Sequence, residues 1–215
     1  MVKLISGPSV NTNLKKIKKL VLFLHGYGAN GSDLINISNL WKEFLPDVAF
    51  YSPNAPFKCD LNPFGYQWFP LNERTENELK KGIELSSPYL KKFVDHILKE
   101  NNLRLKDLLV VGFSQGTILS LNHFTKQQFP CAGILGYSGL FHYSEKEVKK
   151  LDFPIQLFHG ELDEVIDNLY SSKACEDLKK FDYEVNYILG KNLGHSIDEN
   201  GLKIGLKFLK RVFKV

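Results

Sequence analysis

Short apolar runs alternate with helical apolar periods along the chain, and this alternation constrains the fold more than any other feature of the sequence. A strand covered on both faces is apolar at successive positions, whereas a helix lying on a sheet is apolar at every third or fourth position. The alternation predicts an α/β protein with a mostly parallel central sheet and helices on both faces. The expected strands are residues 20–24, 49–51 (the weakest), 108–111, 134–137, 155–158 and 185–189.

The helical periods lie between these runs. The first predicts a single helix capped by Ser32, whose apolar face carries Leu34, Ile37, Trp41 and Phe44. Further helices are expected over residues 90–101, 118–124, 170–178 and 202–213. Whether Pro88 opens the second of these or kinks a longer helix stays open.

Composition supports one compact unit. With 215 residues, 43% of them hydrophobic and 24% charged, the chain can bury a full core, so we expect a single domain over residues 1–215. Its longest apolar run is far shorter than the ~20 residues that cross a bilayer, and no secretory signal is visible. Cys59, Cys131 and Cys175 show no metal or redox spacing, which favours a reduced, cytoplasmic setting. A net charge of +4 does not indicate a nucleic-acid partner.

A candidate nucleophile follows the strand at 108–111. Gly112, Ser114 and Gly116 form a G-x-S-x-G motif between an expected strand and an expected helix, the context in which this motif places a serine hydroxyl above the edge of a sheet. The tight turn needs glycines because side chains two positions either side of the serine would collide. Ser138 lies in a similar setting, but Leu140 replaces the second glycine, so we expect a loop residue there.

A serine nucleophile needs a base and an acid, which in this architecture follow it in the order acid, then histidine. His195, in the loop after the last strand, satisfies that order, whereas for His159, which closes the strand at 155–158, the acid would have to lie earlier in the chain. The acid should come from the loop after residues 155–158. Chemistry alone leaves four carboxylates open there, namely Glu161, Asp163, Glu164 and Asp167.

Acyl transfer also needs two backbone N–H groups directed at the developing oxyanion. One belongs to Gln115, the residue after the nucleophile. The other is expected from the glycine-containing loop 24–31, which lacks the spacing of a nucleotide-binding loop.

Together the segments 24–28 (LHGYG), 52–56 (SPNAP), 112–116 (GFSQG), 159–163 (HGELD) and 194–195 (GH) resemble the carboxylesterase/phospholipase family of α/β-hydrolases, which includes the acyl-protein thioesterases. The resemblance implies an α/β-hydrolase fold, with Ser114 as nucleophile, Asp163 as acid and His195 as base. It also implies that the backbone N–H groups of Tyr27 and Gln115 form the oxyanion hole. The sequence departs from the family at Thr117, Glu164 and Asp167, where glycine or proline is frequent.

An aromatic cluster suggests where an acyl group could bind. Five aromatic residues occur within residues 57–69, and they either pin a long loop to the core or form an apolar wall; both can hold. The expected substrate-binding residues are Phe57, Phe64, Trp68 and Phe69.

These features predict a serine carboxylesterase acting on small esters or thioesters with an apolar, short- to medium-chain acyl group, with no metal or organic cofactor. The alternatives are a lysophospholipase or acyl-protein thioesterase and, less favoured, a binding protein on an inactive scaffold. Lysines on the last helix usually form a solvated face, and weak membrane-surface contact is the minority interpretation. Homodimer formation stays open.

Overall fold

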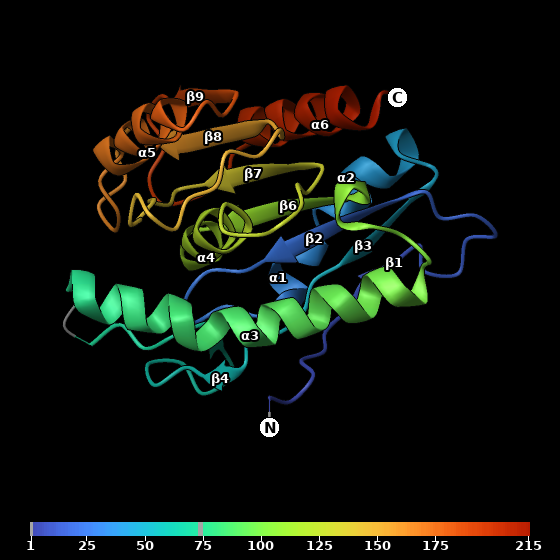
Figure 1. The fold of residues 1–215 in the computed structure, drawn as a ribbon, viewed down its shortest axis with the longest axis horizontal. Helices are drawn as coiled ribbons and strands as arrows, with labels where there is room; N and C mark the ends of the chain where they lie inside the picture. The colour runs from blue at the N-terminus through green and yellow to red at the C-terminus, as the bar shows by residue number, and fades with distance from the viewer. Residues whose placement is uncertain (1, 73–74) are drawn as a thin grey trace.

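A seven-stranded sheet forms the centre of the molecule, for which we use a computed structural model that describes residues 2–72 and 75–215. The strands lie in the order β1-β3-β2-β6-β7-β8-β9 and are parallel, except that β1 runs antiparallel to β3 at one edge (Figure 1). The strands of this sheet are β1 Ser9–Val10, β2 Lys19–Leu24, β3 Val48–Tyr51, β6 Leu108–Phe113, β7 Gly133–Tyr137, β8 Ile155–Gly160 and β9 Val185–Gly190. All six expected strands are present.

Alternate side chains of each central strand enter two separate cores. In β2, Leu20, Leu22 and Leu24 belong to the core on one face, while Val21 and Phe23 belong to the core on the other. Because both faces are covered, these residues are all fully buried. The helices on the first face are α3 Glu76–Glu100, α4 Gln115–Phe124 and α5 Leu169–Lys180, and those on the second are α1 Gly31–Ile35, α2 Ser38–Trp41 and α6 Glu199–Phe213. The predicted fold class is therefore confirmed.

The expected single helix over residues 34–44 is wrong in its cap and its continuity. Asn30, not Ser32, caps α1, with its side chain accepting from the Ser32 N–H while its own N–H donates to Asp33. The helix then breaks into α1, α2 and a 3₁₀ turn, η1 Lys42–Phe44. Phe44 is 53% exposed rather than buried.

Pro88 lies inside α3, so the longer-helix alternative holds. Proline cannot donate the N–H that would bond the preceding turn. The two serines before it bond that turn with their side chains, Ser86 to the Gly82 carbonyl and Ser87 to the Ile83 carbonyl. The helix continues past the proline to Glu100 and crosses the width of the molecule in Figure 1.

The C-terminal helix uses its apolar face for packing. Phe208, Leu209 and Phe213 are buried against the sheet, whereas Lys203 and Lys207 are exposed. The apolar face of α6 therefore packs on the sheet. Within the described residues, no helix is long and apolar enough to cross a bilayer.

Three short strands were not expected from the sequence, namely β1 at the sheet edge and two strands outside the main sheet. β4 Phe57–Lys58 and β5 Tyr66–Gln67 pair antiparallel and form a hairpin outside the main sheet. This hairpin contains much of the aromatic cluster and contacts the candidate site.

Candidate active site

Ser114 occupies a strained turn between β6 and α4. Its backbone has φ 53° and ψ −117°, a region that residues with a Cβ rarely adopt. Close packing of β6, α4 and β2 holds it there. A Cβ on Gly116 would lie 1.9 Å from the Leu24 carbonyl oxygen, and one on Gly112 would lie 2.6 Å from the backbone of Thr117. The motif glycines are therefore required by backbone contacts on both sides of the serine.

Thr117 is accommodated by two glycines of the neighbouring strand and loop. Its methyl group lies 2.6 and 2.4 Å from where a Cβ would stand on Gly136 and Gly139. Its hydroxyl donates to the Tyr137 carbonyl oxygen at 2.7 Å. This departure from the family pattern thus fills space beside the turn without entering it.

Ser138 ends β7 next to this turn and also has a positive φ, 48°. Its N–H donates to the Phe158 carbonyl oxygen at 2.9 Å. Its buried hydroxyl makes no hydrogen bond within the described chain.

Asp163 is the buried carboxylate among the four open candidates, and it bonds His195. Its Oδ2 lies 2.7 Å from His195 Nδ1, and its Oδ1 accepts from the N–H groups of Val165 and Ile166 at 2.9 and 3.0 Å. Burial alone would raise the pKa of this carboxyl, but these N–H groups and the His195 ring hold it below its usual value. The acid is therefore ionised at neutral pH and fixes the imidazole.

The rival carboxylates have other surroundings. Asp167 precedes the N-cap residue Asn168 of α5 and accepts from the N–H of Leu169, the first residue of that helix. Glu161 accepts from the N–H of Asn192 at 3.1 Å. Glu164 is exposed.

His159 is a second partner of the same carboxylate, which sequence reasoning missed. Its Nε2 lies 3.0 Å from Asp163 Oδ2 and 2.8 Å from the Ile166 carbonyl oxygen, and its Nδ1 lies 2.7 Å from Ser171 Oγ. Burial lowers the pKa of His159, against the opposing effect of Ile166 and Asp163. The residue thus helps orient the acid. Its position at the end of a strand, directly before the loop that carries the acid, was the sequence feature that could have indicated this contact.

His195 packs against Phe113, the residue before Ser114. The rings of Phe113 and His195 have centroids 4.9 Å apart, and a Cβ on Gly26 would contact both the Phe113 ring and the Ser114 Cβ. Within the described residues, no hydrogen bond joins Ser114 Oγ to His195. Such bonds are often long before a substrate binds. The structure therefore brings the acid and base into contact and places the base beside the nucleophile's turn.

The loop after β2 is held in one shape by His25. The N–H of Ala55 donates to His25 Nε2 at 2.9 Å, so the neutral ring carries its proton on Nδ1 and donates to the Gly26 carbonyl oxygen at 2.8 Å. Burial lowers the pKa of His25, which keeps the ring neutral. The Gly26 carbonyl belongs to the same planar peptide as the Tyr27 N–H, so fixing one orients the other.

The β4–β5 hairpin is bonded to this loop. The N–H of Gly28 donates to the Tyr66 carbonyl oxygen, the N–H of Tyr66 donates to the Ala29 carbonyl oxygen, and the Asn62 amide donates to the Gly28 carbonyl oxygen. Gly28 has φ +76°, which favours glycine at this position. The hairpin and the loop therefore form one connected wall.

The aromatic cluster divides into core and surface residues. Trp68 and Phe69 are fully buried, and Gln115 bonds both through the Trp68 N–H and the Phe69 carbonyl. They pin the loop and have no surface left for a substrate. Phe57 is half-buried against Tyr89 at a centroid distance of 5.6 Å, and Phe64 is 84% exposed.

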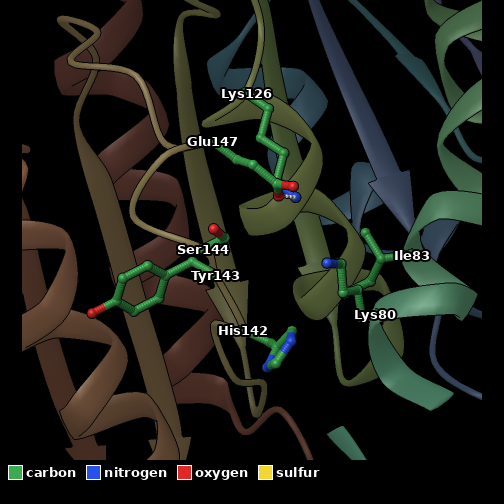
Figure 2. A pocket seen from close by; sticks show the side chains of 7 residues that line it. All are labelled: Lys80, Ile83, Lys126, His142, Tyr143, Ser144 and Glu147. Atoms are coloured by element: carbon green, nitrogen blue, oxygen red, sulfur yellow. Dashed lines mark hydrogen bonds and ion pairs between the residues drawn. The ribbon is translucent and has the colours of Figure 1, made fainter. Parts of the chain in front are cut away.

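A cavity of about 310 Å³ lies apart from these residues (Figure 2). Lys80 and Ile83 enter it from α3, and His142 faces them from the loop after β7. Lys126 Nζ pairs with Glu147 across its far side at 2.5 Å. None of Ser114, Asp163 and His195 lines this cavity, so its polar groups do not belong to the candidate site.

Comparisons with known proteins agree with this geometry. A family model described as phospholipase/carboxylesterase matches residues 6–213. The chain is 26% identical over 196 residues to the esterase YpfH of Escherichia coli (strain K12), covering 91% of this chain and 84% of that protein. It is 25% identical over 232 residues to acyl-protein thioesterase 1 of Debaryomyces hansenii, covering both chains fully. The crystal structure of esterase PE8 superposes with a TM-score of 0.93 at 33% identity, covering 98% of this chain and 100% of that one. The chain therefore belongs to the phospholipase/carboxylesterase family, has the α/β-hydrolase fold and is a serine hydrolase of carboxylic esters.

Proposed function

We propose that Ser114, Asp163 and His195 form the catalytic triad of this hydrolase, which cleaves short- to medium-chain acyl esters through an acyl-enzyme. The observation that carries the proposal is the 2.7 Å contact between Asp163 and His195 Nδ1, beside a serine held at φ 53°. That contact leaves His195 Nε2 to exchange protons with the serine hydroxyl. The strained turn presents the hydroxyl at the carboxyl end of β6.

The reaction has two halves that share the same base. Ser114 Oγ attacks the ester carbonyl carbon while His195 Nε2 takes its proton, and Asp163 stabilises the resulting imidazolium. The carbon–oxygen bond to the alcohol then breaks as Nε2 returns the proton to the leaving oxygen. Water next attacks the acyl carbon of the acyl-enzyme and gives a proton to Nε2. The bond from that carbon to Ser114 Oγ then breaks, Nε2 returns the proton to Oγ, and the carboxylic acid leaves.

The oxyanion is stabilised by backbone N–H groups of Tyr27 and Gln115. Gln115 is the first residue of α4. The N–H groups of a first helical turn have no partners within the helix and form the positive end of its dipole. Its side-chain bonds to the Trp68 and Phe69 backbones fix the position of this helix end. The bond from His25 to the Gly26 carbonyl orients the peptide that contains the Tyr27 N–H.

The acyl group is assigned to the hairpin side, where Phe57 and Phe64 provide apolar surface. A second candidate is a lysophospholipase or acyl-protein thioesterase, favoured by the 84% exposure of both Leu61 and Phe64. Apolar side chains this exposed fit lipid-bearing substrates or weak contact with a membrane surface, and a homodimer would be another way to bury them. A cytoplasmic setting is supported by three free, buried cysteines.

The test uses p-nitrophenyl esters of graded chain length with paired variants. Ser114→Ala should lower kcat about 10⁴-fold or more, while Ser138→Ala, the serine at the end of the next strand, should stay within about twofold. Asp163→Asn should lose far more activity than Asp167→Asn. A fluorophosphonate probe should label the wild type and Ser138→Ala but not Ser114→Ala. Undiminished turnover in Ser114→Ala, or a larger loss for Asp167→Asn, would contradict the assignment.

A further inference from the structure

A second apolar surface includes His195 of the candidate triad in its wall. It is a cleft of about 350 Å³ bounded by the loop after β2, by α1 and the turn that follows it, by Phe113, and by the His195 loop with the start of α6. None of residues 57–69 lines it, so it is separate from the aromatic cluster. Its apolar lining is Ala29, Leu34, Ile37, Phe113, Ile197 and Leu202.

The side of His195 decides which part of an ester can reach this cleft. His195 Nδ1 is held by Asp163, so only Nε2 can deliver a proton to the departing oxygen or sulfur. That atom must come within hydrogen-bond distance of Nε2, about 3 Å. The His195 ring is itself part of the cleft wall, together with Ser196 and Ile197, so the cleft is an apolar space that adjoins the base serving the leaving atom.

We propose that this cleft is the binding site for the leaving alcohol or thiol, and that the acyl group lies on the opposite side, against the hairpin. This inference rests on the proposed function. Its apolar lining selects leaving groups with an alkyl or aryl substituent. The acidic side chain in the lining is Asp33, which is exposed, so the cleft disfavours an anionic leaving group such as a phosphorylated or carboxylated alcohol.

The two-step reaction separates the two sites experimentally. The alcohol is present only during acylation, whereas deacylation involves the acyl group alone. Benzyl and methyl butyrate share an acyl group and differ in the alcohol. Methyl octanoate and methyl butyrate share the alcohol and differ in the acyl group. The ratio of kcat/KM within each pair therefore reports on one site.

Ile37→Trp fills the cleft and should lower the benzyl-to-methyl ratio about tenfold or more, while the octanoate-to-butyrate ratio stays within about twofold. Leu40→Trp, on α2 and 57% exposed outside the cleft, is the matched control and should change neither ratio. Phe64→Ala should change the octanoate-to-butyrate ratio alone. Ile197→Ala, which removes cleft wall, should also lower the benzyl-to-methyl ratio and provides a second variant if Ile37→Trp does not fold.

Charge selectivity gives an independent measurement. Asp33→Asn keeps an oxygen for the Asn30 N–H and should raise kcat/KM for 4-carboxybenzyl butyrate, relative to benzyl butyrate, about fivefold at low salt. If Ile37→Trp lowers both butyrates equally, or changes acyl-length preference instead, the leaving-group assignment is overturned although ester hydrolysis continues. If the wild type hydrolyses no ester at all, the proposed function itself fails.

Discussion

Replacing Ser114 by glycine should stabilise the fold relative to Ser114→Ala, although both variants lose the hydroxyl. The alanine keeps a Cβ at φ 53° and ψ −117°, and such a backbone costs of order 1–3 kcal/mol for a residue other than glycine. Glycine removes that strain but gains about 0.5–1 kcal/mol of chain entropy in the unfolded state. The net expectation is a free energy of unfolding about 1 kcal/mol higher for Ser114→Gly. For a chain of this length, that corresponds to roughly 2–4 °C in Tm.

The assay is urea unfolding followed by circular dichroism, with thermal melts as a second measure. Ser120 provides the matched control, because it is buried in the middle of α4 with helical backbone. There the order should reverse, with Ser120→Gly less stable than Ser120→Ala by about 1 kcal/mol. If glycine is also the less stable replacement at position 114, the backbone of the nucleophile turn is not strained.

Two further predictions concern pH and the turn at Thr117. Burial, aided by Lys91 and Lys126 and opposed by Asp95, lowers the pKa of His123 to about 4 from 6.5. The unfolded chain therefore binds the proton more readily between these values, and stability falls as pH drops through that window. Between pH 7.5 and 4.5, the free energy of unfolding should fall by about 2–3 kcal/mol less in His123→Gln than in wild type. Equal falls in the two proteins would contradict burial of a neutral ring. Thr117→Val removes the hydroxyl that donates to the Tyr137 carbonyl and should lower the free energy of unfolding by about 1 kcal/mol. Thr117→Ser keeps the donor and should lose only the packing of one methyl group. A Thr117→Val variant as stable as wild type would show that the bond contributes nothing.

The expected strands and the nucleophile turn were predictable because their signals are local. Successive apolar residues such as Leu20–Leu24 can only be satisfied by cover on both faces of a sheet, and the structure divides them between two cores. The G-x-S-x-G turn is likewise a short-range steric requirement, set by Gly112 and Gly116 against neighbouring backbone. The helix over 34–44 was predicted less well, because the spacing of apolar residues contains no information on the polar cap that Asn30 and Asp33 form.

Contacts between distant segments were decided by the tertiary structure. Residue chemistry alone left four carboxylates open as the acid, and the family resemblance pointed to Asp163; only packing of the loops after β8 and β9 brings that carboxylate to His195, 32 residues away. The same packing adds His159 to Asp163, and it buries Trp68 and Phe69 while leaving Phe64 exposed within one aromatic cluster. Sequence spacing carries no information on which side chain meets which across such separations, because that depends on how whole elements stack. The amino-acid pattern thus determined the sheet and its reactive turn, and the stacking of helices and loops on that sheet decided which groups surround the serine.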